Sequence, residues 1–151
     1  MTAPGNFSSG DVLTAADMNG LPGGVVAQGR NTTPANLTTS FQTYVSVTFT
    51  GVAGRRYLAV ASIGAYDFNN SGTFEAQITN ATNGDRYATL LFPIPNTSID
   101  YVGASTTGTF TATGSNTIRL RAVVFGGATS ASVINTLSSD PQLQIIDIGE
   151  A

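Results

Sequence analysis

The sequence contains no cysteine, histidine, lysine or tryptophan. Without cysteine, disulfide bonds contribute nothing to its stability. Without histidine, cysteine or lysine, the Ser–His and Cys–His nucleophile systems and Schiff-base catalysis are excluded. Only paired carboxylates remain to supply general acid–base chemistry, as in a glycoside hydrolase.

Charged residues are also scarce, at 10% of the chain. All six basic residues are arginine, and the formal net charge is −3. This balance argues against a nucleic-acid-binding surface and against a polybasic membrane contact. No basic stretch followed by an apolar one opens the sequence, and no apolar run approaches the ~20 residues of a membrane span. We therefore expect no nucleic-acid partner, no membrane partner and no signal peptide.

Threonine is the commonest residue, at 22 of 151 positions, and 41% of the chain is apolar. Threonine, β-branched and aromatic residues favour pleated sheet. Extended segments recur every 8–14 residues or so, with no helical pattern between them. The sequence therefore predicts an all-β fold, a single antiparallel β-sandwich of about eight strands, most simply a jelly roll. An immunoglobulin-like sandwich is the alternative, although the cysteines and core tryptophan of antibody domains are absent.

The segment 41–50 alternates regularly between two faces, with Phe41, Thr43, Val45, Val47 and Phe49 on one of them. This pattern predicts a half-buried antiparallel strand with Tyr44 on the opposite face. The segment 56–68 is largely apolar on both faces, which places it mid-sheet or beneath an interface.

Two local signals predict the geometry of connections. Asn83-Gly84 is the strongest hairpin signal, since both residues tolerate the positive φ of a type I′ turn. Gly108, within an extended threonine-rich segment, marks a possible site for a β-bulge.

The last strand, expected over 142–148, carries apolar residues on both faces. A strand buried on both sides is difficult to place in a sandwich that has one solvated face, and is easier to place if one face packs against a neighbouring subunit. We therefore predict a subunit interface formed by Leu143, Ile145, Ile146 and Ile148.

The only helix signal lies near the start of the chain. Thr14 and Asp17 can form a shortened capping box, Leu13 and Met18 fit a hydrophobic staple, and Pro22 prevents continuation. About one and a half turns are too short to be stable alone, so this helix needs a surface to lie on. The residues predicted to attach it to a partner are Phe7, Val12, Leu13, Met18 and Leu21.

The candidate catalytic carboxylates are Asp67, Glu75, Asp85 and Asp100. Each lies in or beside a predicted turn, where a solvated carboxylate or an Asx turn is the favoured interpretation. The segment 67–72 resembles the first half of a calcium loop, but Ile78 occupies the position of the bidentate carboxylate. A polar loop between two strands is therefore favoured, and we expect neither a metal nor another cofactor.

Tyrosine and arginine offer further candidates. The five tyrosines could stack on a sugar, but their positions in predicted strands favour roles in the core or at a subunit interface. They are Tyr44, Tyr57, Tyr66, Tyr87 and Tyr101. The pairs Arg55/Arg56 and Arg119/Arg121 are expected to face Asp or Glu across strands or subunits.

The segment from Phe7 to Asn19, FSSGDVLTAADMN, followed by LPGG at 21–24, resembles the N-terminal segment of many tailed-phage structural proteins, especially those of phages infecting actinobacteria. The segments 49–57 and 140–149 are similar to the strand–turn–strand element and the closing strand of those proteins. The resemblance implies a virion structural protein, of the minor tail, tail-fibre or capsid-decoration type. It also implies a trimeric knob like those of tumour-necrosis-factor-like domains.

Together these observations predict an attachment segment, 1–24, and a jelly-roll domain, 25–151. The expected function is a non-enzymatic, homotrimeric protein on the virion surface, on capsid or tail, bound to other virion proteins. The alternative is a carbohydrate-binding receptor module of a tail fibre that contacts a host surface glycan. A small glycoside hydrolase is the third hypothesis.

Overall fold

The computed structural model describes residues 22–33, 35–95, 101–133 and 140–151. These residues form ten strands and no helix. The strands are β1 (Gly24–Arg30), β2 (Asn36–Leu37), β3 (Gln42–Gly51), β4 (Arg55–Tyr66), β5 (Gly72–Asn80), β6 (Arg86–Ile94), β7 (Tyr101–Thr111), β8 (Gly114–Phe125), β9 (Ala131–Val133) and β10 (Gln142–Glu150). The all-β prediction is confirmed, whereas the predicted N-terminal helix lies outside the described residues.

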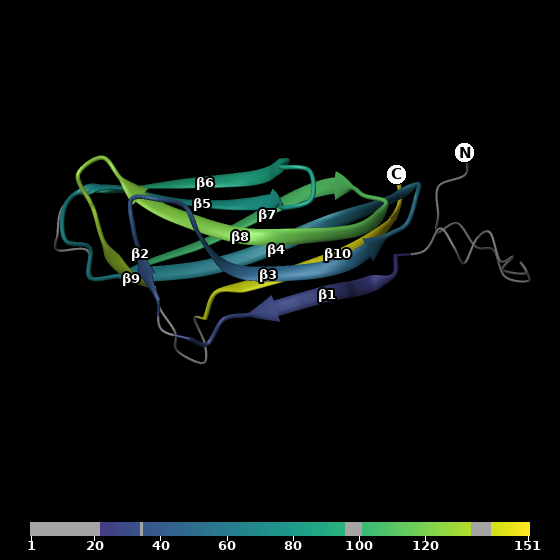
Figure 1. Ribbon diagram of the computed structural model, residues 1–151, viewed down its shortest axis with the longest axis horizontal. Coiled ribbons are helices and arrows are strands. Elements are labelled where there is room, and N and C mark those ends of the chain that lie inside the picture. Colours follow the sequence, from purple (N-terminus) through teal and green to yellow (C-terminus); the bar gives the residue numbers. More distant parts are fainter. Residues whose placement is uncertain (1–21, 34, 96–100, 134–139) are drawn as a thin grey trace, which may run out of the picture.

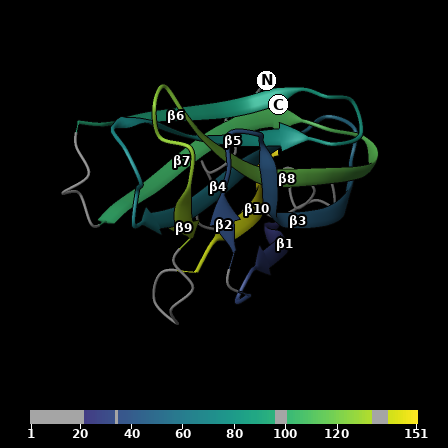
Figure 2. The same cartoon turned by 60° about the vertical axis from the view of Figure 1, so that its left-hand side comes forward.

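The strands form two antiparallel sheets packed face to face (Figure 1). The six-stranded sheet has the order β1-β10-β4-β9-β2, and β7 pairs with the other edge of β4. The four-stranded sheet has the order β3-β8-β5-β6. Short strands β2 and β9 lie side by side at one end of the molecule (Figure 2). This architecture agrees with the predicted jelly roll.

The core lies between the sheets and is built by period-two alternation along the long strands. In β4 and β8 alternate residues point inward, and they are almost completely buried: Tyr57, Ala59, Ala61, Ile63, Ile118, Leu120, Ala122 and Val124. At one place the core is aromatic. Tyr87 stacks on Phe110 with ring centroids 4.2 Å apart, and Phe49 meets Tyr57 edge-on at 4.9 Å. Burying each large side chain contributes about 1.5–3 kcal/mol.

A buried asparagine joins this aromatic cluster to the turns. The Asn80 side-chain amide donates to the Tyr87 hydroxyl and to Asn116 Oδ1, both at 3.0 Å. Its oxygen accepts from the amide of Thr82 at 2.8 Å. Because each of these polar groups is paired, the network links β5, β6 and β8 without the cost of an unsatisfied buried group.

The prediction for Tyr44 is wrong, and the cause is a β-bulge. The register between β3 and β8 shifts between Thr43 and Val45, so Tyr44 and Val45 are both buried. The Tyr44 hydroxyl donates to the carbonyl of Asn36 at 2.9 Å. Its burial raises the pKa of Tyr44 to about 12. Residues of the strand before a bulge point to the opposite face from the one that simple alternation predicts. The sequence pattern alone does not show where a bulge lies.

The two local turn predictions also need correction. The β5–β6 connection is a hairpin, but among its residues Gly84 has positive φ and Asn83 does not, so the turn is not type I′. The backbone amide of Gly84 donates instead to the carbonyl of Asn80 at 2.9 Å. Gly108 lies in a regular register with β4 rather than at a bulge. A side chain there would meet the Tyr87 carbonyl at 2.5 Å, which explains the glycine by close packing of β7 on β6.

Candidate functional site

The outer face of the six-stranded sheet is uncharged at its centre, with Arg56 of β4 and Arg30 of β1 at its two ends. One row across it contains Val25, Ile146, Leu58 and Thr109 from four adjacent strands. The next row contains Gln28, Gln144, Val60 and Thr107. The strands contribute these residues because each alternates between the core face and the outer face.

The aliphatic residues of this face are incompletely covered within one chain. Val25 is 53% exposed, and Leu58, Val60 and Ile146 are partly exposed. Glutamines on β1 and β10 and small threonine and serine side chains on β7 surround them. A flat patch of this kind, uncharged at its centre, has the composition of an interface core.

The structure separates the four predicted interface residues into two pairs. Leu143 and Ile145 point between the sheets and have no exposed surface, so they belong to the core of the subunit. Ile146 and Ile148 point outward and are partly exposed. One apolar face of β10 therefore packs in the core of its own subunit. Only the other face, with Ile146 and Ile148, is accessible to another chain.

The predicted attachment residues Phe7, Val12, Leu13, Met18 and Leu21 all lie outside the described residues. The first described strand, β1, begins at Gly24. The sequence-based interface missed Val25, Leu58 and Val60. The signal for Leu58 and Val60 was present, because the segment 56–68 is apolar on both faces, but the pairing of β4 with β10 was not known.

Neither a protein-family model nor a curated protein sequence matches this chain. Among solved structures, Eiger TNF from S. frugiperda superposes with a TM-score of 0.55 at 12% identity, covering 85% of this chain and 95% of that chain. Murine APRIL at pH 5.0 superposes with a TM-score of 0.50 at 11% identity, covering 83% of this chain and 99% of that chain. The described chain shares the jelly-roll fold of these two structures. At these identities the likeness concerns the fold alone.

A more distant match is the CBM36-1 domain of a multidomain xylanase from the hindgut metagenome of Trinervitermes trinervoides. Its TM-score is 0.41 at 16% identity, and it covers 84% of this chain and 90% of that chain.

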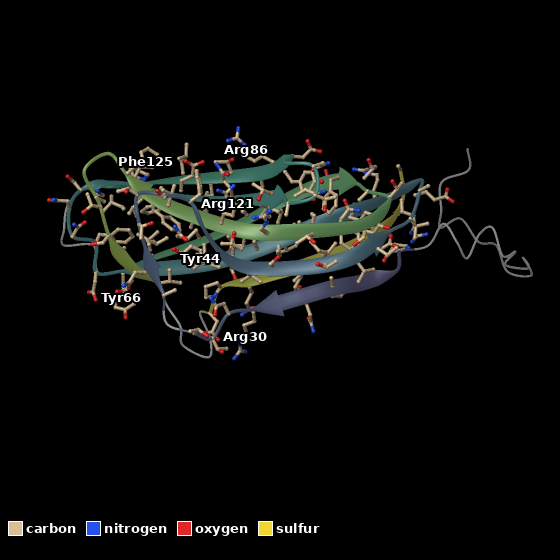
Figure 3. All side chains as sticks on the ribbon, viewed as in Figure 1. Arg30, Tyr44, Tyr66, Arg86, Arg121 and Phe125 are labelled. Carbon is tan, nitrogen blue, oxygen red and sulfur yellow. The ribbon has the colours of Figure 1, made fainter. Side chains whose placement is uncertain are left out.

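The tyrosines do not form a sugar-stacking surface within the described residues. Tyr44 and Tyr57 are buried in the core, and Tyr87 stacks on Phe110. The core role favoured by their strand positions is confirmed for these three. Tyr66 is exposed at 37%, at the end of β4 that carries β9 (Figure 3). The side chain of Tyr101 lies outside the described residues.

Of the candidate catalytic carboxylates, Asp67 and Asp85 lie in connections between strands, and Glu75 lies on β5 of the four-stranded sheet. Asp67 has a φ of 54°, and Asp85 accepts from the side chain of Asn83 at 2.7 Å. Glu75 accepts from Gln77 at 2.5 Å. Asp100 lies outside the described residues. The rest of the loop after Asp67 is held by Asn69, whose side chain bonds Thr129 and Ser130.

No group of three or more acidic residues gathers as a metal site within the described ranges. No helix in the described part of the chain is long and apolar enough to cross a membrane.

A buried ion pair joins the end of β10 to the start of β4. Arg55 Nε donates to Asp147 Oδ2 at 2.6 Å, and the amide of Gly149 donates to Oδ1 at 3.0 Å. Burial alone would raise the pKa of Asp147, but these bonds and one from the backbone of Gly23 hold that pKa below its ordinary value. The expectation that Arg55 faces an acid is confirmed. The sequence signal for its partner was an aspartate within an otherwise apolar strand.

This pair predicts a specific loss of stability in acid. Because the pKa of Asp147 is lower in the folded chain, its carboxylate stabilises the fold above its ordinary pKa of 3.8, and this contribution is lost as the pH falls through the folded-state pKa. We expect the free energy of unfolding to fall more steeply below about pH 4 in the unchanged protein than in Asp147→Asn. Urea unfolding at a series of pH values checks this. A constant offset between the two curves would contradict it.

Proposed function

We propose that the chain is a non-enzymatic structural protein of a phage particle that assembles as a homotrimer through the outer face of its six-stranded sheet. The observation that carries the trimer is the uncharged row of Val25, Ile146 and Leu58, continued by Val60 and Ile148. Burying such a surface against copies of itself removes apolar area from water without desolvating a charge.

The other sheet is poorly suited to self-association. Its outer face carries Arg86, Arg119 and Arg121. Contact between identical copies of this face would bring like charges together, which costs free energy. The six-stranded sheet also has two arginines on its outer face, Arg30 and Arg56, but they lie at opposite ends of it, so its centre can be buried without desolvating a charge.

The proposed location rests on the resemblance of the first 24 residues to the N-terminal segments of tailed-phage structural proteins. In this proposal Phe7, Leu13 and Met18 attach the trimer to a capsid or tail protein, and the jelly roll is displayed outward. The proposed role requires no catalytic group, and the described acidic residues are not gathered in one place.

Particle binding tests the location separately from the trimer. Purified protein is added to phage particles that lack this chain, and immunogold labelling records its position. We expect the full chain to decorate the particle and the double variant Leu13→Asp/Met18→Asp to leave it bare while retaining the trimer mass. A matched variant, Thr50→Asp, changes an exposed residue of β3 and should still bind. Equal labelling by the double variant would contradict the attachment role.

A further inference from the structure

Half of the arginines gather on the outer face of the four-stranded sheet. Arg119 and Arg121 are two apart on β8, and Arg86 is on β6. Across β5, Thr79 pairs with Arg119 on one side and with Arg86 on the other. Strand geometry places the Cα atoms of Arg119 and Arg121 roughly 7 Å apart and those of Arg119 and Arg86 roughly 10 Å apart. Figure 3 shows Arg86 and Arg121 over this sheet, away from Arg30.

These three arginines have no acidic partner within the described residues. The ion pairs of the described chain use Arg30 with Asp140 and Arg55 with Asp147. Glu75 is the only acidic residue in the four strands, and it accepts from Gln77. Arg119 and Arg121 therefore do not pair with an acid across strands within the described residues, and pairing with an acid across subunits stays a prediction.

The arginine side chains cover the strand between them. Gln77 and Thr79 point outward from β5, yet each is only 7% exposed. Arg121 and Arg119 are their register partners on β8. Such covering is typical of arginine, whose stem packs on the sheet while its guanidinium stays at the surface. The guanidinium of Arg121 is further positioned over the ring of Phe41, 4.9 Å from its centroid.

The cluster does not stabilise the chain by itself. Three like charges on one face repel one another, and Glu75, the one acidic residue of these four strands, bonds Gln77 and not an arginine. The guanidinium of Arg121 is nevertheless partly ordered by its contact with Phe41, so binding an anion would cost less side-chain entropy there. This combination is what an anion-binding surface requires.

The surroundings of the cluster identify the kind of anion. Thr43 and Ser46 border it on β3 and Thr89 borders it on β6, so hydroxyl groups separate the charges. The exposed apolar residues of this face, Leu91 and Phe125, lie towards its other end, so its centre lacks the apolar core of a protein interface. A net charge of −3 and three cations are also too little for strong nucleic-acid binding.

We propose that this face binds an anionic polysaccharide. Its carboxylate or phosphate groups would be held by Arg86, Arg119 and Arg121, because a guanidinium binds either group through two parallel hydrogen bonds. Sugar hydroxyls would bond the threonine and serine side chains between the arginines. This inference goes beyond the proposed function, since it requires neither the trimer nor the particle.

Calorimetric titration of the full chain tests the inference with three polymers: alginate oligosaccharide, which bears carboxylates; glycerol-phosphate teichoic acid, which bears phosphates; and neutral dextran. We expect binding to at least one anionic polymer, weakened by added salt, and none to dextran. Arg121→Gln and Arg119→Gln should each weaken that binding by about tenfold. Which anionic polymer binds distinguishes carboxylate from phosphate recognition.

The matched control is Arg56→Gln, which removes the same charge from an exposed position on β4 of the other sheet. It should leave binding within about twofold of the unchanged protein. Equal weakening by Arg56→Gln and Arg121→Gln would overturn the site. Tighter binding of an acidic peptide or of single-stranded DNA than of either anionic polymer would overturn the polysaccharide class. Repeating the titration with Ile146→Asp separates this result from the fate of the trimer.

Discussion

Ile146→Asp is expected to convert a particle of three chain masses into a folded monomer of 15.5 kDa. Ile146 is at the centre of the uncharged row on the outer face, with Leu58 beside it on β4. An aspartate there would be buried without a partner in each of the three subunits. An uncompensated buried charge costs about 3–5 kcal/mol, enough to disfavour assembly at micromolar concentration. Sedimentation velocity measures the change.

The control for this variant introduces the same charge on the opposite sheet. Thr50 is exposed on β3, so Thr50→Asp should leave the trimer intact. Circular dichroism shows whether both variants retain the strand content of the unchanged protein. A trimeric, folded Ile146→Asp would contradict the proposed interface.

Ile145→Ala is expected to lower the free energy of unfolding by about 2–5 kcal/mol, although its neighbour Ile146 can be changed without unfolding the subunit. Ile145 has no exposed surface, and it pairs with Ala59 in the middle of the six-stranded sheet. Removing its side chain leaves a cavity that the surrounding strands cannot fill. Urea unfolding in the Ile146→Asp background gives the value for the monomer, free of the contribution of assembly.

The conservative variant Ile145→Val should cost only about 0.5–1.5 kcal/mol, because it removes one methylene group. A cost for Ile145→Ala below about 1 kcal/mol would mean that this face of β10 is not the core face. The outcome would then support the original assignment of Ile145 to an interface.

Most of the fold could be predicted because the chain alternates so regularly. The inward residues of β4 and β8, such as Ile63 and Leu120, follow the period-two pattern without exception. For Tyr44 the prediction was wrong because of one inserted residue. The bulge at Thr43–Val45 turns Tyr44 inward, and no propensity scale marks the position of a bulge within an unbroken polar–apolar alternation.

Only part of the candidate interface could be predicted, because its residues come from strands whose pairing the sequence does not reveal. Two apolar faces on β10 indicated a second contact, but the sequence could not say which face packs inside its own subunit. That depends on β10 pairing with β1 and β4, which are more than 75 residues away in the chain. The unpaired arginines depend on topology in the same way, since Arg86 approaches Arg119 only through β5.

The molar mass of the unchanged protein at micromolar concentration, measured by multi-angle light scattering, tests the central claim most directly. The uncharged centre of the outer face of the six-stranded sheet predicts a mass of three chains, independent of dilution through that range. A mass of 15.5 kDa, that of one chain, would contradict it.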